Sequence, residues 1–134
     1  MTRRQLTIVR ILFAAYLIAV LWLCFGNFSS TRDMPRELWG IPLDKIVHFL
    51  MFLPFPVLAF FAFDRFTEKF WASVLWTSVS FLAGCAFAAG TEYVQARLLP
   101  YRTGDLADFK ADLLALALSS VIVLILDISK QKKA

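Results

Sequence analysis

Residues 11–28 read ILFAAYLIAVLWLCFGNF and include no charged side chain. An α-helix needs roughly 20 mostly apolar residues to cross the hydrocarbon core of a bilayer. Three more runs of about that length follow, at residues 44–63, 71–96 and 106–126. Each run is continuously apolar, whereas the strands of a membrane barrel alternate apolar and polar side chains. The sequence therefore predicts an all-α fold, a bundle of four transmembrane helices.

The composition agrees with a membrane protein. Of the 134 residues, 60% are hydrophobic and 18% are charged, against about 45–50% and about 25% in soluble domains. A soluble domain of this size has too little interior to bury so much apolar surface. The composition does not change along the chain, so we predict a single domain, residues 1–134. The net charge is +4, but the bases lie in short clusters between apolar runs, which is typical of membrane proteins and gives no reason to expect a nucleic-acid partner.

The basic residues also predict the orientation, because Lys and Arg are enriched on the cytoplasmic side of a membrane. With a cytoplasmic N-terminus, the inner segments would hold eight bases and the outer segments with the adjoining helix ends six. The first ten and the last five residues contain bases and no acid, while the outer segments mix both charges. We therefore predict that both termini are cytoplasmic.

Unusual polar side chains lie at three of the helix ends. In an antiparallel bundle, the start of the second helix, the end of the third and the start of the fourth reach the same membrane face. The polar residues at these ends are Asp44, Lys45, His48, Glu92, Gln95, Arg102, Asp105, Asp108 and Asp112. An ionisable group costs roughly 2.5–3.5 kcal/mol at the centre of a membrane helix, so such groups normally pair. We expect these nine residues to form one cluster and regard them as candidate ligand-binding residues.

Two further patterns concern helix packing. Pro54 and Pro56 lie midway along the second run and should kink it, because proline cannot donate a backbone hydrogen bond. Small residues recur every four positions in the third and fourth runs, which lets helix backbones approach closely. They are Gly84 and Ala88, Ala86 and Gly90, and Ala107, Ala111, Ala115 and Ser119. The alternative is that small residues are simply common in membrane helices.

Three short blocks of this sequence resemble the VanZ-like family of small bacterial membrane proteins. They are Asp44-Lys45-Ile46-Val47-His48-Phe49, Glu92-Tyr93-Val94-Gln95 and Arg102-Thr103-Gly104-Asp105-Leu106-Ala107-Asp108. These blocks are similar to the family's D-K-x-x-H, E-x-x-Q and Arg-to-Asp segments, and together they span about half of the chain. The chain departs from the family at Asp112, where Asn is usual, and at Ala115, where Gly is usual.

The resemblance implies a multi-pass protein of the bacterial plasma (inner) membrane. It also implies a link to the cell envelope, because the family is named for a member associated with low-level resistance to the glycopeptide teicoplanin. It supplies no established reaction, so the activity has to be argued from the residues.

Two classes of function follow from the predicted cluster. In the first, the protein is an envelope-related binding or accessory protein, and Lys45 and Arg102 hold an anionic headgroup such as a lipid phosphate. In the second, it is a membrane hydrolase or transferase acting on a lipid-linked phosphate. His48 would then be the general base or nucleophile, oriented by Glu92 or Asp108. The sequence has no nucleophile elbow, Walker loop or HExxH motif, so we rank binding above catalysis.

Two other interpretations remain open. His48, Glu92 and Asp108 offer ligand atoms for a divalent ion, but the chain has one histidine and no cysteine nearby. We therefore expect neither a metal nor another cofactor. Alternatively, the charges only lock the bundle in register, as buried ion pairs do in some proteins.

Overall fold

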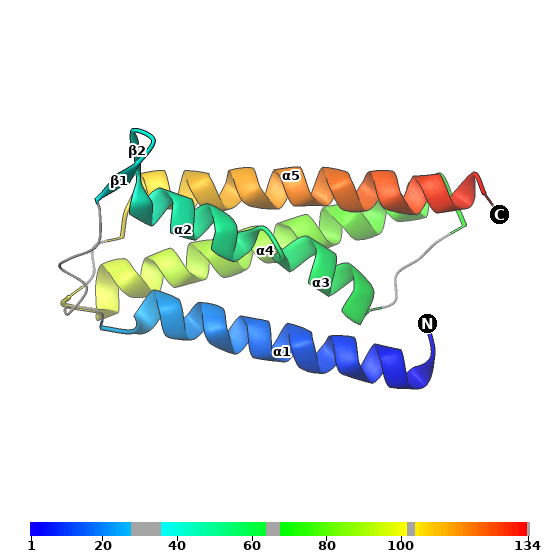
Figure 1. Cartoon of the computed structure of the whole chain (residues 1–134), viewed down its shortest axis with the longest axis horizontal. Coiled ribbons are helices and arrows are strands. Elements are labelled where there is room, and N and C mark those ends of the chain that lie inside the picture. The colour runs from blue at the N-terminus through cyan, green and yellow to red at the C-terminus, as the bar shows by residue number, and fades with distance from the viewer. Residues whose placement is uncertain (28–35, 64–67, 102–103, 134) are drawn as a thin grey trace.

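The computed structural model of the chain describes residues 1–27, 36–63, 68–101 and 104–133 (Figure 1). In these residues four helical segments are long and apolar enough to cross a membrane. They are α1 (Arg3–Phe25), α2 (Leu43–Phe52) together with α3 (Phe55–Ala62), α4 (Phe70–Leu98) and α5 (Leu106–Gln131). The predicted set of four helical spans is confirmed, and the architecture is compatible with a multi-pass membrane protein.

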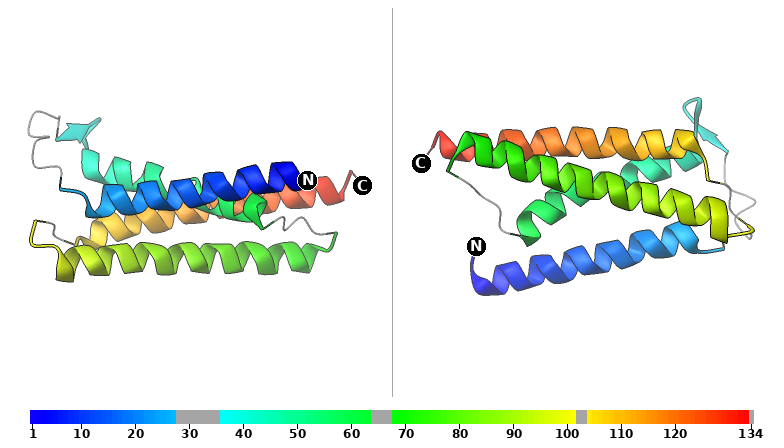
Figure 2. Two further views of the ribbon diagram at one scale, coloured as in Figure 1. Left: turned by 90° about the horizontal axis from the view of Figure 1, so that it is seen from below. Right: turned by 180° about the vertical axis from the view of Figure 1, so that it is seen from behind.

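The spans run antiparallel, so that both termini lie at one end of the bundle (Figure 1). Helices α4 and α5 pack along each other, α2 packs on α5, and α3 lies between α1 and α4 near the termini (Figures 1 and 2). The outer faces of the helices expose large apolar side chains, such as those of Ile18, Leu82 and Leu114. A surface of this kind is stable against lipid and would be a liability in water.

Helix α1 begins at Arg3 and not at residue 11, because its start is set by a cap and not by the apolar run. The Thr2 hydroxyl accepts a hydrogen bond from the Gln5 backbone N–H, and the Gln5 side chain accepts one from the Thr2 N–H at 2.9 Å. This capping box satisfies two backbone donors that the first turn leaves unpaired. The prediction from hydropathy alone was therefore wrong about this boundary. The helix ends at Phe25, and residue 28 lies outside the described residues.

The second span is broken where the prolines predicted a kink. Helix α2 ends at Phe52, and α3 starts at Phe55 after Pro54. Pro56 lies in the first turn of α3, where a missing N–H leaves no helical hydrogen bond unmade. Beyond the break α3 runs toward α1, and it also packs on α4 and α5 (Figure 1). Lys45 and His48 both lie on the short helix α2.

A two-stranded hairpin precedes α2 and is an addition to the all-α prediction. Strands β1 (Glu37–Leu38) and β2 (Ile41–Pro42) pair antiparallel around Trp39 and Gly40. Both turn residues have positive φ, 54° and 77°, as a type I′ hairpin turn requires. Trp39 is 89% exposed, which suits a position at the membrane–water interface, where tryptophan is enriched.

Close packing of α4 on α5 and α3 depends on Gly84. A Cβ atom at this position would lie 2.6 Å from Leu116 Cδ2 and 3.1 Å from Phe55 Cδ1. Gly84 and Ala88 are both buried, so this small-residue pair is a packing surface as predicted. Ala86 and Gly90 are exposed, so the prediction of a packing surface was wrong for this pair.

Valine at position 84 should therefore destabilise the bundle, while valine at position 90 should not. Overpacking a filled interface typically costs about 1–3 kcal/mol, whereas a Cβ at Gly90 meets no atom within 4 Å. We expect Gly84→Val to lower the unfolding midpoint in an SDS titration of mixed micelles. An equal shift for Gly90→Val would contradict the packing account.

Candidate ligand site at three helix ends

Lys45 ties the start of α2 to the start of α5. Its Nζ atom lies 2.6 Å from Asp108 Oδ1, 2.8 Å from Asp105 Oδ2 and 3.1 Å from Asp44 Oδ2. An ammonium group has three N–H donors, so each donor has one carboxylate partner. The Asp108 side chain is 11% exposed, whereas those of Asp105 and Asp44 are 48% and 56% exposed. The contact with Asp108 is therefore the most buried of the three.

Deeper in the bundle, three carboxylates surround the ring of His48. Its Nδ1 atom lies 3.1 Å from Asp112 Oδ1 and 3.7 Å from Glu92 Oε1, and its Nε2 atom lies 3.7 Å from Asp108 Oδ2. Asp112 is completely buried, and His48 is 7% exposed. An ionised carboxylate can only accept hydrogen bonds. Asp112 therefore holds the proton on Nδ1, and the lone pair of a neutral ring is then on Nε2, toward Asp108.

Glu92 connects α4 to the turn before α5. Its Oε2 atom accepts a hydrogen bond from the Asp105 backbone N–H at 3.1 Å. Its Oε1 atom is buried and has no hydrogen-bond partner among the described residues, and the same holds for Asp112 Oδ2. A buried polar atom left without a partner is costly. These two oxygens are the least satisfied acceptors of the cluster.

Asp105 is the N-cap of α5. Its Oδ1 atom accepts a hydrogen bond from the Ala107 N–H at 2.9 Å, while Oδ2 faces Lys45. The hydrogen bond from Lys45, followed by the one from Ala107, lowers the pKa of the Asp105 carboxyl below its ordinary value. Asp105 therefore stays ionised at neutral pH, where its charge also favours the helix N-terminus.

Gln95 and Tyr101 bind the end of α1 to the same region. The buried Gln95 side chain donates a hydrogen bond from Nε2 to the Cys24 carbonyl at 2.8 Å, and Tyr101 donates one to the Phe25 carbonyl at 2.7 Å. The last carbonyls of a helix have no partner within the helix, and these two side chains supply one. Gln95 thus serves as a tether between helices. Tyr101 was missed, because a single loop tyrosine carries no spacing signal.

The tether provides a matched pair of substitutions. Tyr101→Phe removes the hydrogen bond to Phe25, which should lower the free energy of unfolding by about 1 kcal/mol. Tyr93→Phe makes the same chemical change on the exposed face of α4 and should leave stability unchanged. Thermal unfolding in detergent micelles compares them, and equal midpoints for the two variants would show that the hydrogen bond contributes nothing.

The three helix ends and the end of α1 enclose a cavity of about 390 Å³, which we call the polar pocket. Its polar lining consists of Asp44, His48, Gln95, Tyr101, Asp105 and Asp108, and its apolar wall of Leu23, Cys24, Leu43, Val47 and Met51. The volume is within the range of small-molecule sites, about 300–1,000 Å³. The ionisable lining consists of three aspartates and His48, and the ammonium of Lys45 contacts all three aspartates.

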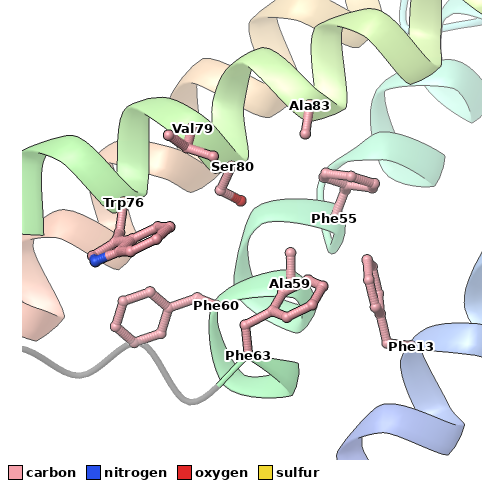
Figure 3. A pocket seen from close by; sticks show the side chains of 9 residues that line it. All are labelled: Phe13, Phe55, Ala59, Phe60, Phe63, Trp76, Val79, Ser80 and Ala83. Atoms are coloured by element: carbon pink, nitrogen blue, oxygen red, sulfur yellow. The ribbon is translucent and has the colours of Figure 1, made fainter.

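A second hollow, of about 230 Å³, lies between α1, α3 and α4 (Figure 3). Phenylalanine rings from α1 and α3 face Trp76 and Ser80 of α4 across it (Figure 3). Its lining includes no ionisable side chain. This hollow therefore offers a ligand no acid, base or ionic partner.

The structure describes eight of the nine predicted site residues, and Arg102 lies outside the described residues. Seven of the eight form one connected set of polar contacts: Asp44, Lys45, His48, Glu92, Asp105, Asp108 and Asp112. Gln95 lines the pocket beside them. The predicted convergence of these residues is confirmed, while their role in ligand binding stays a prediction.

No protein-family model, curated protein or solved structure matches the chain. The relationship to the VanZ-like family therefore stays a prediction that depends on the three sequence blocks. Lys45 from the first block contacts Asp105 and Asp108 from the third, and His48 contacts Asp108. Glu92 from the second block lies 3.7 Å from His48 Nδ1.

Proposed function

We propose that the chain is a VanZ-like, multi-pass protein of the bacterial plasma membrane that binds an anionic lipid or a lipid-linked phosphate. The polar pocket would lie on the extracytoplasmic face, because the base-rich termini are at the opposite end of the bundle (Figure 1). The observation that carries the proposal is the meeting of three helix ends around one pocket, whose three lining aspartates hold the ammonium of Lys45. Binding there would make the protein an envelope-related accessory factor, with low-level glycopeptide resistance as one candidate outcome.

Lys45 is the described residue best placed to bind a phosphate. Two of its partners, Asp44 and Asp105, are about half exposed, and exposed ion pairs contribute little to stability. A phosphate oxygen can therefore replace one of them on Lys45 Nζ while Asp108 keeps the ammonium in position. Arg102 is the second predicted base, and a guanidinium binds phosphate through paired hydrogen bonds.

Binding of a lipid phosphate can be measured directly. The full-length protein in phosphatidylcholine nanodiscs is titrated with labelled phosphatidic acid. We expect saturable binding that Arg102→Ala weakens at least tenfold, since one bidentate contact is worth about 1.5–3 kcal/mol. Arg97→Ala, which removes an exposed base near the end of α4, is the matched control and should bind as the unmodified protein does. Unchanged binding by Arg102→Ala, in protein that still inserts normally, would end the proposal.

The His48–Asp112 pair favours a second candidate, a hydrolase or transferase acting on a lipid-linked phosphate. A carboxylate at 3.1 Å from Nδ1 orients the ring and leaves Nε2 to act as a general base. Incubation of the purified protein with a lipid phosphate would then give a product whose formation requires His48. If no turnover is seen, or if His48→Gln retains it, the catalytic role is excluded.

A further inference from the structure

We propose that His48, Glu92 and Asp108 form a binding site for one divalent transition-metal cation, Zn²⁺ or Mn²⁺. The three side chains come from α2, α4 and α5, and one ligand atom of each lies within 4.8 Å of the others. The site consists only of residues of this chain, so it does not depend on which lipid or substrate enters the pocket. The sequence counted against a metal because it has one histidine, whereas the fold adds two carboxylates beside that histidine.

The distance between His48 Nε2 and Asp108 suits two ligands of one ion better than a hydrogen bond. The distance from Nε2 to Asp108 Oδ2 is 3.7 Å, too long for a hydrogen bond. Two ligands that are each about 2.1 Å from a tetrahedral ion are separated by about 3.4 Å. Asp112 occupies Nδ1 at 3.1 Å, which is the carboxylate contact that commonly orients a metal-binding histidine. The lone pair on Nε2 is thereby directed toward the space beside Asp108.

Unpaired acceptor atoms on two residues that contact His48 are a second observation. Asp112 has no exposed surface, and its Oδ2 atom has no hydrogen-bond partner among the described residues. The buried Glu92 Oε1 atom also has no hydrogen-bond partner among the described residues. Glu92, Asp108 and Asp112 bring three carboxyl groups together, and Lys45 contacts Asp108 alone of these three. When all three are ionised, a divalent cation would balance the excess negative charge, which is costly when it is removed from water.

The donor set indicates the class of ion. One imidazole nitrogen with carboxylate oxygens suits Zn²⁺ or Mn²⁺, whereas Ca²⁺ requires six to eight oxygen ligands. His48 and Asp108 line the polar pocket, so water or a phosphate oxygen can complete the coordination. The carboxylates of Asp44, Asp105 and Asp108 also lie close together. That group already surrounds the ammonium of Lys45, so we do not assign the ion to it.

Metal content can be measured on the purified full-length protein in nanodiscs. The protein is stripped with EDTA and dialysed to equilibrium against Zn²⁺ or Mn²⁺, and the bound ion is quantified by inductively coupled plasma mass spectrometry. We expect one ion per chain. His48→Gln and Glu92→Gln should each weaken binding at least tenfold. Glu37→Gln, the same change in the exposed hairpin of this end of the bundle, should bind as the unmodified protein does.

Two measurements keep a folding defect from being mistaken for loss of a ligand. Asp112→Asn retains the shape of the side chain and should weaken binding about 10–100-fold, as removal of a histidine-orienting carboxylate does. Co²⁺ serves as a spectroscopic probe, and its visible absorption should change in His48→Gln. The site is refuted if the unmodified protein binds no ion, or if His48→Gln and Glu92→Gln bind as well as Glu37→Gln. Phosphatidic acid binding by the stripped protein is measured separately. The metal site and the lipid-binding proposal can therefore be refuted independently of each other.

Discussion

Replacing Lys45 with methionine should lower the free energy of unfolding by about 2 kcal/mol. The ammonium contacts three carboxylates, and without it Asp108 would be a nearly buried anion beside two others. Removing one partner of a fully buried ion pair costs about 3–5 kcal/mol. Lys45 is 21% exposed, and water screens part of the interaction, so the expected loss is smaller. An SDS titration in mixed micelles measures it.

Two variants separate the role of the charge from that of the side chain. Lys45→Arg keeps a cation on α2 and should recover most of the stability. Lys110→Met removes an exposed base from α5, and we expect no more than about 0.5 kcal/mol of change, as for most surface substitutions. If Lys45→Met were as stable as Lys110→Met, the ion pairs would have no part in holding α2 against α5.

Substitution of His48 by leucine should have a larger effect, about 3 kcal/mol. The ring lies between Asp108, Glu92 and Asp112, and its removal leaves three carboxylates facing an apolar side chain. Uncompensated buried charge is among the most destabilising changes in a protein. The energetic cost should appear as a lower unfolding midpoint in the same titration.

A double-mutant cycle identifies the origin of that loss. If it comes from the carboxylates, His48→Leu should cost less in an Asp112→Asn background, where one of the charges has been removed. A coupling of about 1–2 kcal/mol is typical of residues in direct contact. Additive effects of the two substitutions would mean that Asp112 and His48 do not interact energetically, despite their 3.1 Å contact.

Hydropathy and proline positions predicted the spans because membrane insertion depends on one-dimensional properties of the chain. A run of about 20 apolar residues has few structural alternatives in lipid. The break at Pro54 followed in the same way, from a backbone donor that proline lacks. The start of α1 at Arg3 could not be found from hydropathy, because the cap at Thr2 depends on hydrogen bonds and not on apolarity.

The composition of the charged cluster could be predicted, but its pairing could not. An antiparallel order of four helices is enough to bring Lys45, Glu92 and Asp108 to one membrane face. Which side chains touch depends on helix rotation, and that is set by packing at positions such as Gly84. The hairpin turn at Trp39 was missed for a related reason, since a bulky residue with positive φ is not a usual turn signal.

The central claim is that the polar pocket lies on the extracytoplasmic side, opposite to both termini. Labelling of intact cells with a membrane-impermeant maleimide tests it, in protein whose two native cysteines have been replaced by alanine. We predict that a Trp39→Cys variant is labelled from outside, since Trp39 is exposed in the hairpin at the end of the bundle opposite to both termini. A Lys132→Cys variant, near the C-terminus, should be labelled only after permeabilisation. The reverse pattern, or labelling of both positions from the same side, would contradict the account.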